Sequence, residues 1–214
     1  IVRLVGSEMC IRDSYQSVSD EKTRGWFEHF WGANLDPKPG LTVVEIMHAV
    51  HNKEIKGLYV EGENPAMSDP NLNHVREALT MLDHLVVQDI FLTETAGFAD
   101  VILPASAFPE KTGTFTNSNR QVQLGRQAID PPGESKQDWW IIQEIARRMG
   151  LDWNYNGPSE IFAEIRQATP SMAGITWERL EAEHSLTYPL ENEGDPGEPV
   201  IFKQGFPTET GKAR

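Results

Sequence analysis

The sequence predicts an α/β protein built on a parallel sheet, and three short apolar runs carry that prediction. They are "KGLYVEG" at 56–62, "LVVQDIF" at 85–91 and "VILPASAF" at 101–108. Their length and composition are typical of buried strands. A helical pattern separates the first two runs, and a short helical turn separates the last two. This alternation of strand and helix is typical of parallel sheets.

Helical periodicity accounts for the segments between and before these strands. The segment "GWFEHFWG" at 25–32 forms an aromatic helical patch, and 41–55 predicts a short helix with Thr42 as its N-cap. In 69–84, apolar residues recur at helical spacing and Asp69-Pro70 marks the expected helix start. We therefore expect helices on the sheet.

The second half of the chain predicts less regular additions. Residues 119–129 have the pattern of an extended arm, and 131–150 predict a turn followed by a helix that ends at Gly150. Residues 157–181 predict a shorter helical annex.

Composition suggests three domain segments. Residues 15–182 are expected to form the α/β domain with its annex. Residues 183–199 are acidic and rich in Gly and Pro, which is typical of a linker. Residues 200–214 are interpreted as the truncated start of a further domain.

The first 14 residues are not expected to belong to the fold. Residues 4–14 can be reverse-translated into a DNA string that resembles the adapter and transposase end used in transposon-based library preparation. We interpret 1–14 as a sequencing-adapter artefact and exclude it, with Cys10, from fold and site. The alternative is a mobile leader at a true N-terminus. On the adapter interpretation, the chain is an internal fragment of a longer protein.

Composition excludes several classes of function. The 214 residues carry a formal net charge of −13, which disfavours nucleic acid and anionic membrane surfaces as partners. No window has the ~18 apolar residues that a membrane span needs. The single cysteine cannot form an internal disulfide, hold a cluster or make a structural zinc site.

Polar and small residues follow each predicted strand at its carboxyl end, where open parallel sheets bind ligands. Glycine allows close backbone approach, and the amide, hydroxyl and carboxylate groups offer donors and acceptors. The alternative is that they are ordinary turn and cap residues. The candidates are Gly62, Asn64, Ser68, Gln88, Asp89 and Ala105.

Asp138 is a further candidate with two possible roles. It precedes a helix, where a carboxylate is favoured by the dipole. A carboxylate can also accept from N1–H and N2–H of guanine together. His48 and His51 lack a third ligand and are read as surface histidines, and Glu110–Lys111 as a solvated pair. No catalytic or metal-ligating residue is proposed, and the chain has no GxGxxG or P-loop.

Two segments carry a resemblance to a known family. They are "QDIFLTETAGFADVILPASAFPEKTGTFTN" at 88–117 and "DWWIIQEIARRMG" at 138–150. Together with the "GENPAMS" loop, they resemble molybdopterin oxidoreductases, and within them the catalytic α subunit of formate dehydrogenase. The resemblance implies a partial Rossmann-like domain that cradles a molybdopterin guanine dinucleotide carrying molybdenum or tungsten. It also implies iron–sulfur clusters upstream and a dinucleotide-capping domain that begins near residue 200.

The resemblance assigns roles to the candidates one by one. Asn64 and Ser68 are expected at the nucleotide portion, Gln88 and Asp89 at its ribose and phosphate, and the Ala105 backbone close to it. Some family members have Asp at position 64 and a hydroxyl residue at position 105. By the same resemblance, Asp138 reads the guanine.

The resemblance also sets expectations for the parent protein. It would be a cytoplasmic enzyme that oxidises formate to carbon dioxide and passes electrons through iron–sulfur clusters to NAD, with an NAD- or flavin-binding partner subunit. The fragment alone is expected to be inactive. The alternatives are a nitrate reductase-like molybdopterin oxidoreductase and a non-catalytic nucleotide-binding or assembly relative.

Overall fold

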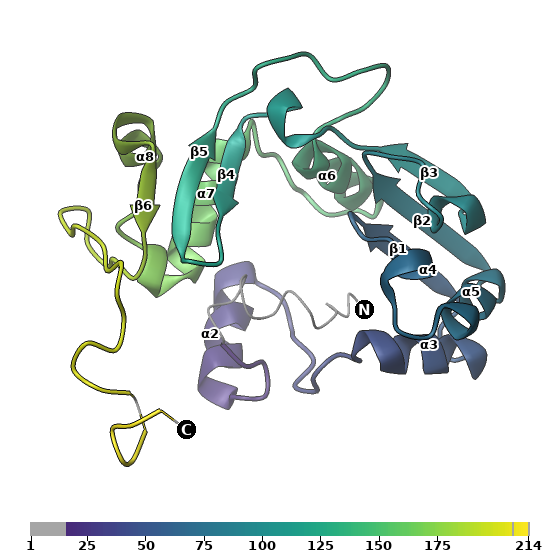
Figure 1. Ribbon diagram of the computed structural model, residues 1–214, viewed down its shortest axis with the longest axis horizontal. Helices are drawn as coiled ribbons and strands as arrows, with labels where there is room; N and C mark the ends of the chain where they lie inside the picture. Colours follow the sequence, from purple (N-terminus) through teal and green to yellow (C-terminus); the bar gives the residue numbers. More distant parts are fainter. Residues whose placement is uncertain (1–15, 207, 214) are drawn as a thin grey trace. The chain divides into compact units, whose positions relative to one another are not determined.

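The computed structural model describes residues 16–206 and 208–213, in two compact units (Figure 1). The first unit comprises the chain up to Lys111 together with Gln127–Asn154. The second comprises Thr112–Arg126 and the chain from Tyr155 onward. The interpretation of residues 1–14 as an adapter artefact lies outside the described residues.

The first unit contains the predicted parallel sheet. Its strands are β1 (Gly57–Glu61), β2 (His84–Asp89) and β3 (Val101–Pro104). They run parallel in the order β1-β2-β3, with Val60 opposite Val87 and Asp89 opposite Pro104. The prediction of a parallel α/β sheet is confirmed, and the three carboxyl ends meet at one edge.

Helices cover one face of this sheet. They include α3 (Val43–His51) and α5 (Leu72–Thr80), with the short α4 (Pro65–Ser68) and the turn η1 (Ala96–Phe98) in the connections (Figure 1). Alternate strand residues on this face join them in one apolar core, in which Val87 and Ala78 are fully buried. The other face of β1 and β2 therefore carries the intervening residues, among them Tyr59, Glu61 and Gln88.

Helix boundaries follow local capping. Thr42 and Glu45 form a capping box at α3, as the choice of Thr42 predicts. The start predicted at Asp69-Pro70 is wrong, because α5 begins at Leu72. There the Asn71 side chain accepts from the N–H of His74 at 3.4 Å.

Two further helices belong to the first unit. The aromatic segment forms α2 (Glu21–Trp31). The predicted helix near the end of the unit is α6 (Asp138–Arg148), followed by Met149 as C-cap and by Gly150 at φ +88°. That left-handed conformation is the one glycine adopts without strain, which explains why the helix stops there.

The second unit has its own small core. An antiparallel sheet contains β4 (Gly113–Thr116), β5 (Gln121–Gly125) and β6 (Ser185–Thr187), in that order. The helices α7 (Pro158–Ala168) and α8 (Trp177–Glu183) and the turn η3 (Pro170–Met172) complete it. Their shared apolar cluster includes Val122, Ile175 and Leu180, all fully buried.

Two segments of this unit differ from their prediction. The extended arm expected at 119–129 contains β5, so it is extended as predicted, but β5 is the central strand of a sheet and not a free arm. The linker expected at 183–199 contains β6, and Leu186 and Leu190 within it are buried. These leucines bury apolar surface in spite of the acidic residues around them, so composition alone misses the strand. Residues 200–206 and 208–213 contain no helix or strand.

In the part of the chain that the structure describes, every helix is too short or too polar to cross a membrane.

Candidate functional site

The loops at the carboxyl edge of β1–β3 are tied to one another by the backbone. The Gly62 N–H donates to the Gln88 carbonyl at 2.9 Å, and the Ala105 N–H donates to the Asp89 carbonyl at 3.0 Å. Gly62 has φ +63°, a conformation that favours glycine. The six residues predicted from strand ends therefore lie on neighbouring strands or in the loops that follow them.

Asn64 joins the loop after β1 to the loop after β2. Its side-chain oxygen accepts from the N–H of Thr95 at 3.1 Å and from the Thr95 hydroxyl at 2.8 Å. Its Nδ2 donates to Glu94 Oε2 at 2.7 Å. Both acceptor positions of the amide are used, and Thr95 is fully buried. Asn64 is thus a structural tie between the two loops, and its contact with a nucleotide stays a prediction.

Replacing Asn64 with leucine should lower the free energy of unfolding by about 1–3 kcal/mol, because the buried donors of Thr95 lose their acceptor. The matched control is Asn73→Leu, at an exposed position of α5. Urea unfolding at pH 7 measures both. The Asn64 hydrogen bond also holds the pKa of Glu94 below its ordinary value, and that contribution to stability is present at neutral pH and lost on acidification. Equal stability of the two variants would contradict the tie.

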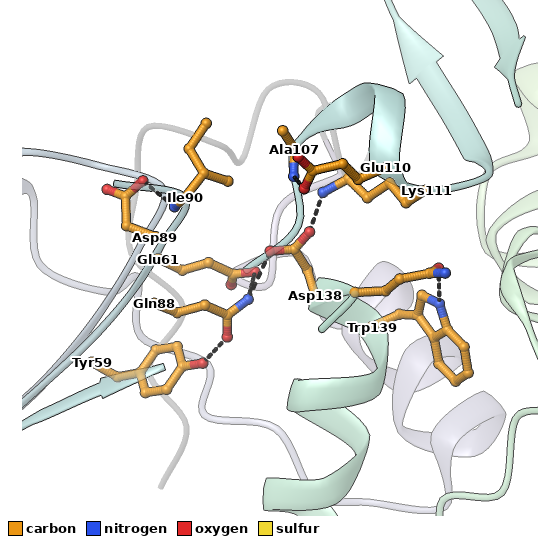
Figure 2. Close-up of polar contacts among 11 residues, drawn as sticks. Tyr59, Glu61, Gln88, Asp89, Ile90, Ala107, Glu110, Lys111, Asp138 and Trp139 are labelled. Carbon is orange, nitrogen blue, oxygen red and sulfur yellow. Dashed lines mark hydrogen bonds and ion pairs between the residues drawn. The ribbon is translucent and has the colours of Figure 1, made fainter. Parts of the chain in front are cut away.

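A second polar cluster lies on the face of the sheet opposite α3 and α5, and it centres on Gln88 (Figure 2). The Gln88 side chain is fully buried. Its Nε2 donates to Asp138 Oδ1 at 2.8 Å and to Glu61 Oε1 at 3.1 Å. The Tyr59 hydroxyl donates to its Oε1, and Lys111 Nζ pairs with Asp138 Oδ2. One amide therefore connects two strands to the first residue of α6.

Of the two roles predicted for Asp138, the structure supports that of a carboxylate at a helix N-terminus, and the reading of guanine stays a prediction. It is the first residue of α6, where the helix dipole favours a carboxylate. It also lies beside the end of β2, through Gln88. The prediction of a solvated Glu110–Lys111 pair is wrong: both side chains are half-buried, Lys111 pairs with Asp138, and Glu110 accepts from the Ala107 N–H at 2.8 Å.

The remaining predicted residues have local partners. Asp89 Oδ1 accepts from the Ile90 N–H at 2.6 Å, and the exposed Ser68 hydroxyl donates to the Asn64 carbonyl at 3.1 Å. Ala105 is buried, and the hydroxyl of its neighbour Ser106 is buried without a hydrogen-bond partner among the described residues. The sequence does not single out Ser106, because hydroxyl residues are common in loops and a serine there does not by itself indicate a site.

Tyr59, Glu61 and Lys111 were also missed as members of the cluster. The sequence could have indicated Tyr59 and Glu61, because alternate residues of a strand share a face. Glu61 also lies opposite Gln88 in the parallel register. Lys111 carried no such signal, since it lies 27 residues from Asp138 in the sequence.

Tyr59 should make stability depend on alkaline pH. Burial, followed by the charges of Glu61 and Asp138, raises the pKa of Tyr59 from 10.0 to about 12. The folded state thus keeps its proton where the unfolded chain loses it. Its contribution to stability is full below pH 10 and declines as pH rises through about 12. Urea unfolding from pH 8 to 11.5 should show a shallower decline in Tyr59→Phe than in the unmodified chain, and identical slopes would contradict the assignment.

The histidines of α3 lie against α5. The rings of His51 and His74 stack at 4.0 Å between centroids, and His51 Nε2 lies 3.1 Å from the His74 carbonyl oxygen. Among residues 16–206 and 208–213, no group of three or more His, Cys, Asp or Glu side chains is arranged to hold a metal ion.

Comparisons with known proteins agree with this fold. A family model described as molybdopterin oxidoreductase matches residues 14–148. The chain is 47% identical over 200 residues to a Staphylococcus haemolyticus protein named "Putative formate dehydrogenase", and 45% identical over 199 residues to "Probable oxidoreductase YjgC" of Bacillus subtilis. These alignments cover 94% and 93% of this chain. The chain spans 20% of the length of each relative.

A solved structure shares the fold. It is acetylene hydratase from Pelobacter acetylenicus, with a TM-score of 0.60 and 21% sequence identity. The superposition covers 95% of this chain and 28% of that chain. At this identity the likeness concerns the fold alone, whereas the family match covers more than half of the chain. The chain belongs to the molybdopterin oxidoreductase family.

Proposed function

We propose that this chain is part of the α subunit of a molybdenum- or tungsten-dependent formate dehydrogenase, and that the carboxyl edge of β1–β3 holds part of a molybdopterin guanine dinucleotide. The observation that carries the site is the position of Asp138, a carboxylate at the start of α6 and beside the end of β2. The names of the staphylococcal relatives support the choice of formate as substrate.

The residues at this edge fit such a cofactor. Guanine offers two adjacent donors, N1–H and N2–H, and a carboxylate is their natural acceptor. Ser106 adds a buried hydroxyl without a partner among the described residues, beside the Ala105 backbone. Lys111 pairs with Asp138, so the carboxylate expected to accept from guanine has a cation beside it in a chain with net charge −13.

The chain's own part in the reaction is to bind and orient the cofactor. Asp138 would hold the guanine, while Gly62, Ser68 and Asp89 would lie along the nucleotide. Asn64 keeps the loops after β1 and β2 together, and Gln88 donates a hydrogen bond to Asp138. When bound, the cofactor supplies two-electron redox chemistry at its metal. No residue of this chain is assigned a catalytic role.

The rest of the proposal concerns the whole protein. It would act in the cytoplasm and pass electrons from formate through iron–sulfur clusters to an NAD- or flavin-binding subunit. This chain spans 20% of the length of the relatives that it matches. We therefore expect formate oxidation from the full-length protein and none from the 214 residues alone.

Two assays test the proposal. The first is formate-dependent reduction of a dye by the full-length protein, with nitrate as the competing substrate class. The second is calorimetric titration of the 214-residue chain with guanosine and cytidine 5′-monophosphates. Formate turnover and a preference for guanine support the proposal. A full-length protein that binds guanine nucleotides but holds no metal would identify a non-catalytic relative instead.

A further inference from the structure

The orientation of the Gln88 amide is fixed by its partners. An amide has an acceptor end and a donor end, and the two can exchange by a flip. Here the carboxylates of Glu61 and Asp138 both need donors, so Nε2 must face them. The Tyr59 hydroxyl supplies the donor that Oε1 needs. All three contacts agree on one orientation.

Two of the three side chains that contact the Gln88 amide, Tyr59 and Glu61, come from β1. Tyr59 and Glu61 are two residues apart, so their side chains share the face of the sheet that carries Gln88 (Figure 2). They contact opposite ends of the Gln88 amide, one as donor and one as acceptor. With one Nε2 hydrogen taken by Glu61, the second hydrogen is directed at Asp138 Oδ1.

We infer that Tyr59 and Glu61 are positioning residues that orient the Asp138 carboxylate through Gln88 and so set its preference for guanine. This inference rests on the proposed function. Each carboxylate oxygen has two lone pairs, so Asp138 can keep Gln88 on Oδ1 and Lys111 on Oδ2 and still accept N1–H and N2–H of guanine with the remaining lone pairs. Reading two parallel donors requires that the plane of the carboxylate be fixed.

Lys111 cannot supply this orientation by itself. Its ammonium group is a point charge on a flexible stem, with three donors that rotate freely. It stabilises charge on Asp138 Oδ2 but leaves the carboxylate free to turn about that contact. Gln88 is planar and fully buried, and it approaches the other oxygen, Oδ1. Together they hold both oxygens.

The test compares guanosine and inosine 5′-monophosphates, whose bases differ only by the 2-amino group. Inosine monophosphate lacks the N2–H donor and so loses one hydrogen bond to the charged Asp138. The unmodified 214-residue chain should therefore bind it about 10-fold or more weakly than it binds guanosine monophosphate. In Tyr59→Phe/Glu61→Leu, the preference should fall below about 3-fold, because the carboxylate turns more freely. Tyr59→Phe keeps the ring and Glu61 is exposed, so both changes are compatible with folding.

The matched control is Tyr155→Phe/Glu63→Leu. It removes a half-buried phenol hydroxyl from the other unit and an exposed carboxylate from the loop after β1. The control should keep the full preference for guanosine monophosphate. Loss of preference in both double variants would show a general effect of charge or stability and overturn the inference.

A ligand-free measurement separates the inference from the proposed function. Side-chain NMR should show the Gln88 amide and the Asp138 carboxyl carbon shifting in Tyr59→Phe/Glu61→Leu and not in the control. Unchanged signals would overturn the inference, whatever the nucleotide data show. Shifted signals in a chain that does not distinguish the two nucleotides would support the positioning of Asp138, reject guanine selectivity and contradict the proposed guanine site.

Discussion

Replacing Asp138 with asparagine should weaken the binding of guanosine 5′-monophosphate by about 10–100-fold. The carboxylate offers an acceptor on each oxygen, whereas asparagine replaces one of them with a donor. That donor would face a donor of guanine, and the charge that strengthens the remaining hydrogen bond is lost. Isothermal calorimetry on the 214-residue chain measures the change.

A matched control distinguishes this effect from a change in net charge. Asp83→Asn removes the same charge at an exposed position before β2 and should leave affinity unchanged. Asp138→Asn also deprives Lys111 of its partner, so circular dichroism should accompany the titration. A folded Asp138→Asn variant with undiminished affinity would leave Asp138 only its role as a helix N-terminal carboxylate.

The sheet was predictable because its signals are local. Each strand is a short apolar run, and the connections between strands have helical spacing or a turn. Their carboxyl ends then place Gly62, Asn64 and Gln88 near one edge, whatever the details of packing. The strand β6 could not be predicted in this way, because its burial depends on a core assembled from segments that are distant in the sequence.

The partners within the site could not be predicted from the sequence. Asn64 and Thr95 are 31 residues apart, and Gln88 and Asp138 are 50 apart. Such pairs depend on strand register and on the path of loops, and composition specifies neither. A polar residue at a strand end can face a ligand or hold a neighbour. The hydrogen bonds of Asn64 and Gln88 show that both side chains hold neighbours.

Replacing Leu85 with alanine should lower the free energy of unfolding of the first unit by about 2–5 kcal/mol. Leu85 lies on β2 and is 1% exposed within the core beneath the site. Removing its side chain leaves a cavity that the surrounding β-strand and helix cannot fully close. Leu92→Ala, at a site 83% exposed in the loop after β2, should change stability by less than about 0.5 kcal/mol.

Native-state hydrogen exchange resolves where the stability is lost after Leu85→Ala. Because each unit has its own apolar cluster, amides of β1 and β2 should lose protection while those of β5 keep more of it. Leu180→Ala, fully buried in the second cluster, should give the reverse pattern. Equal loss across both units in each variant would mean that they unfold as one. A separate response would mean that the sheet carrying Gln88 can be destabilised independently of the second unit.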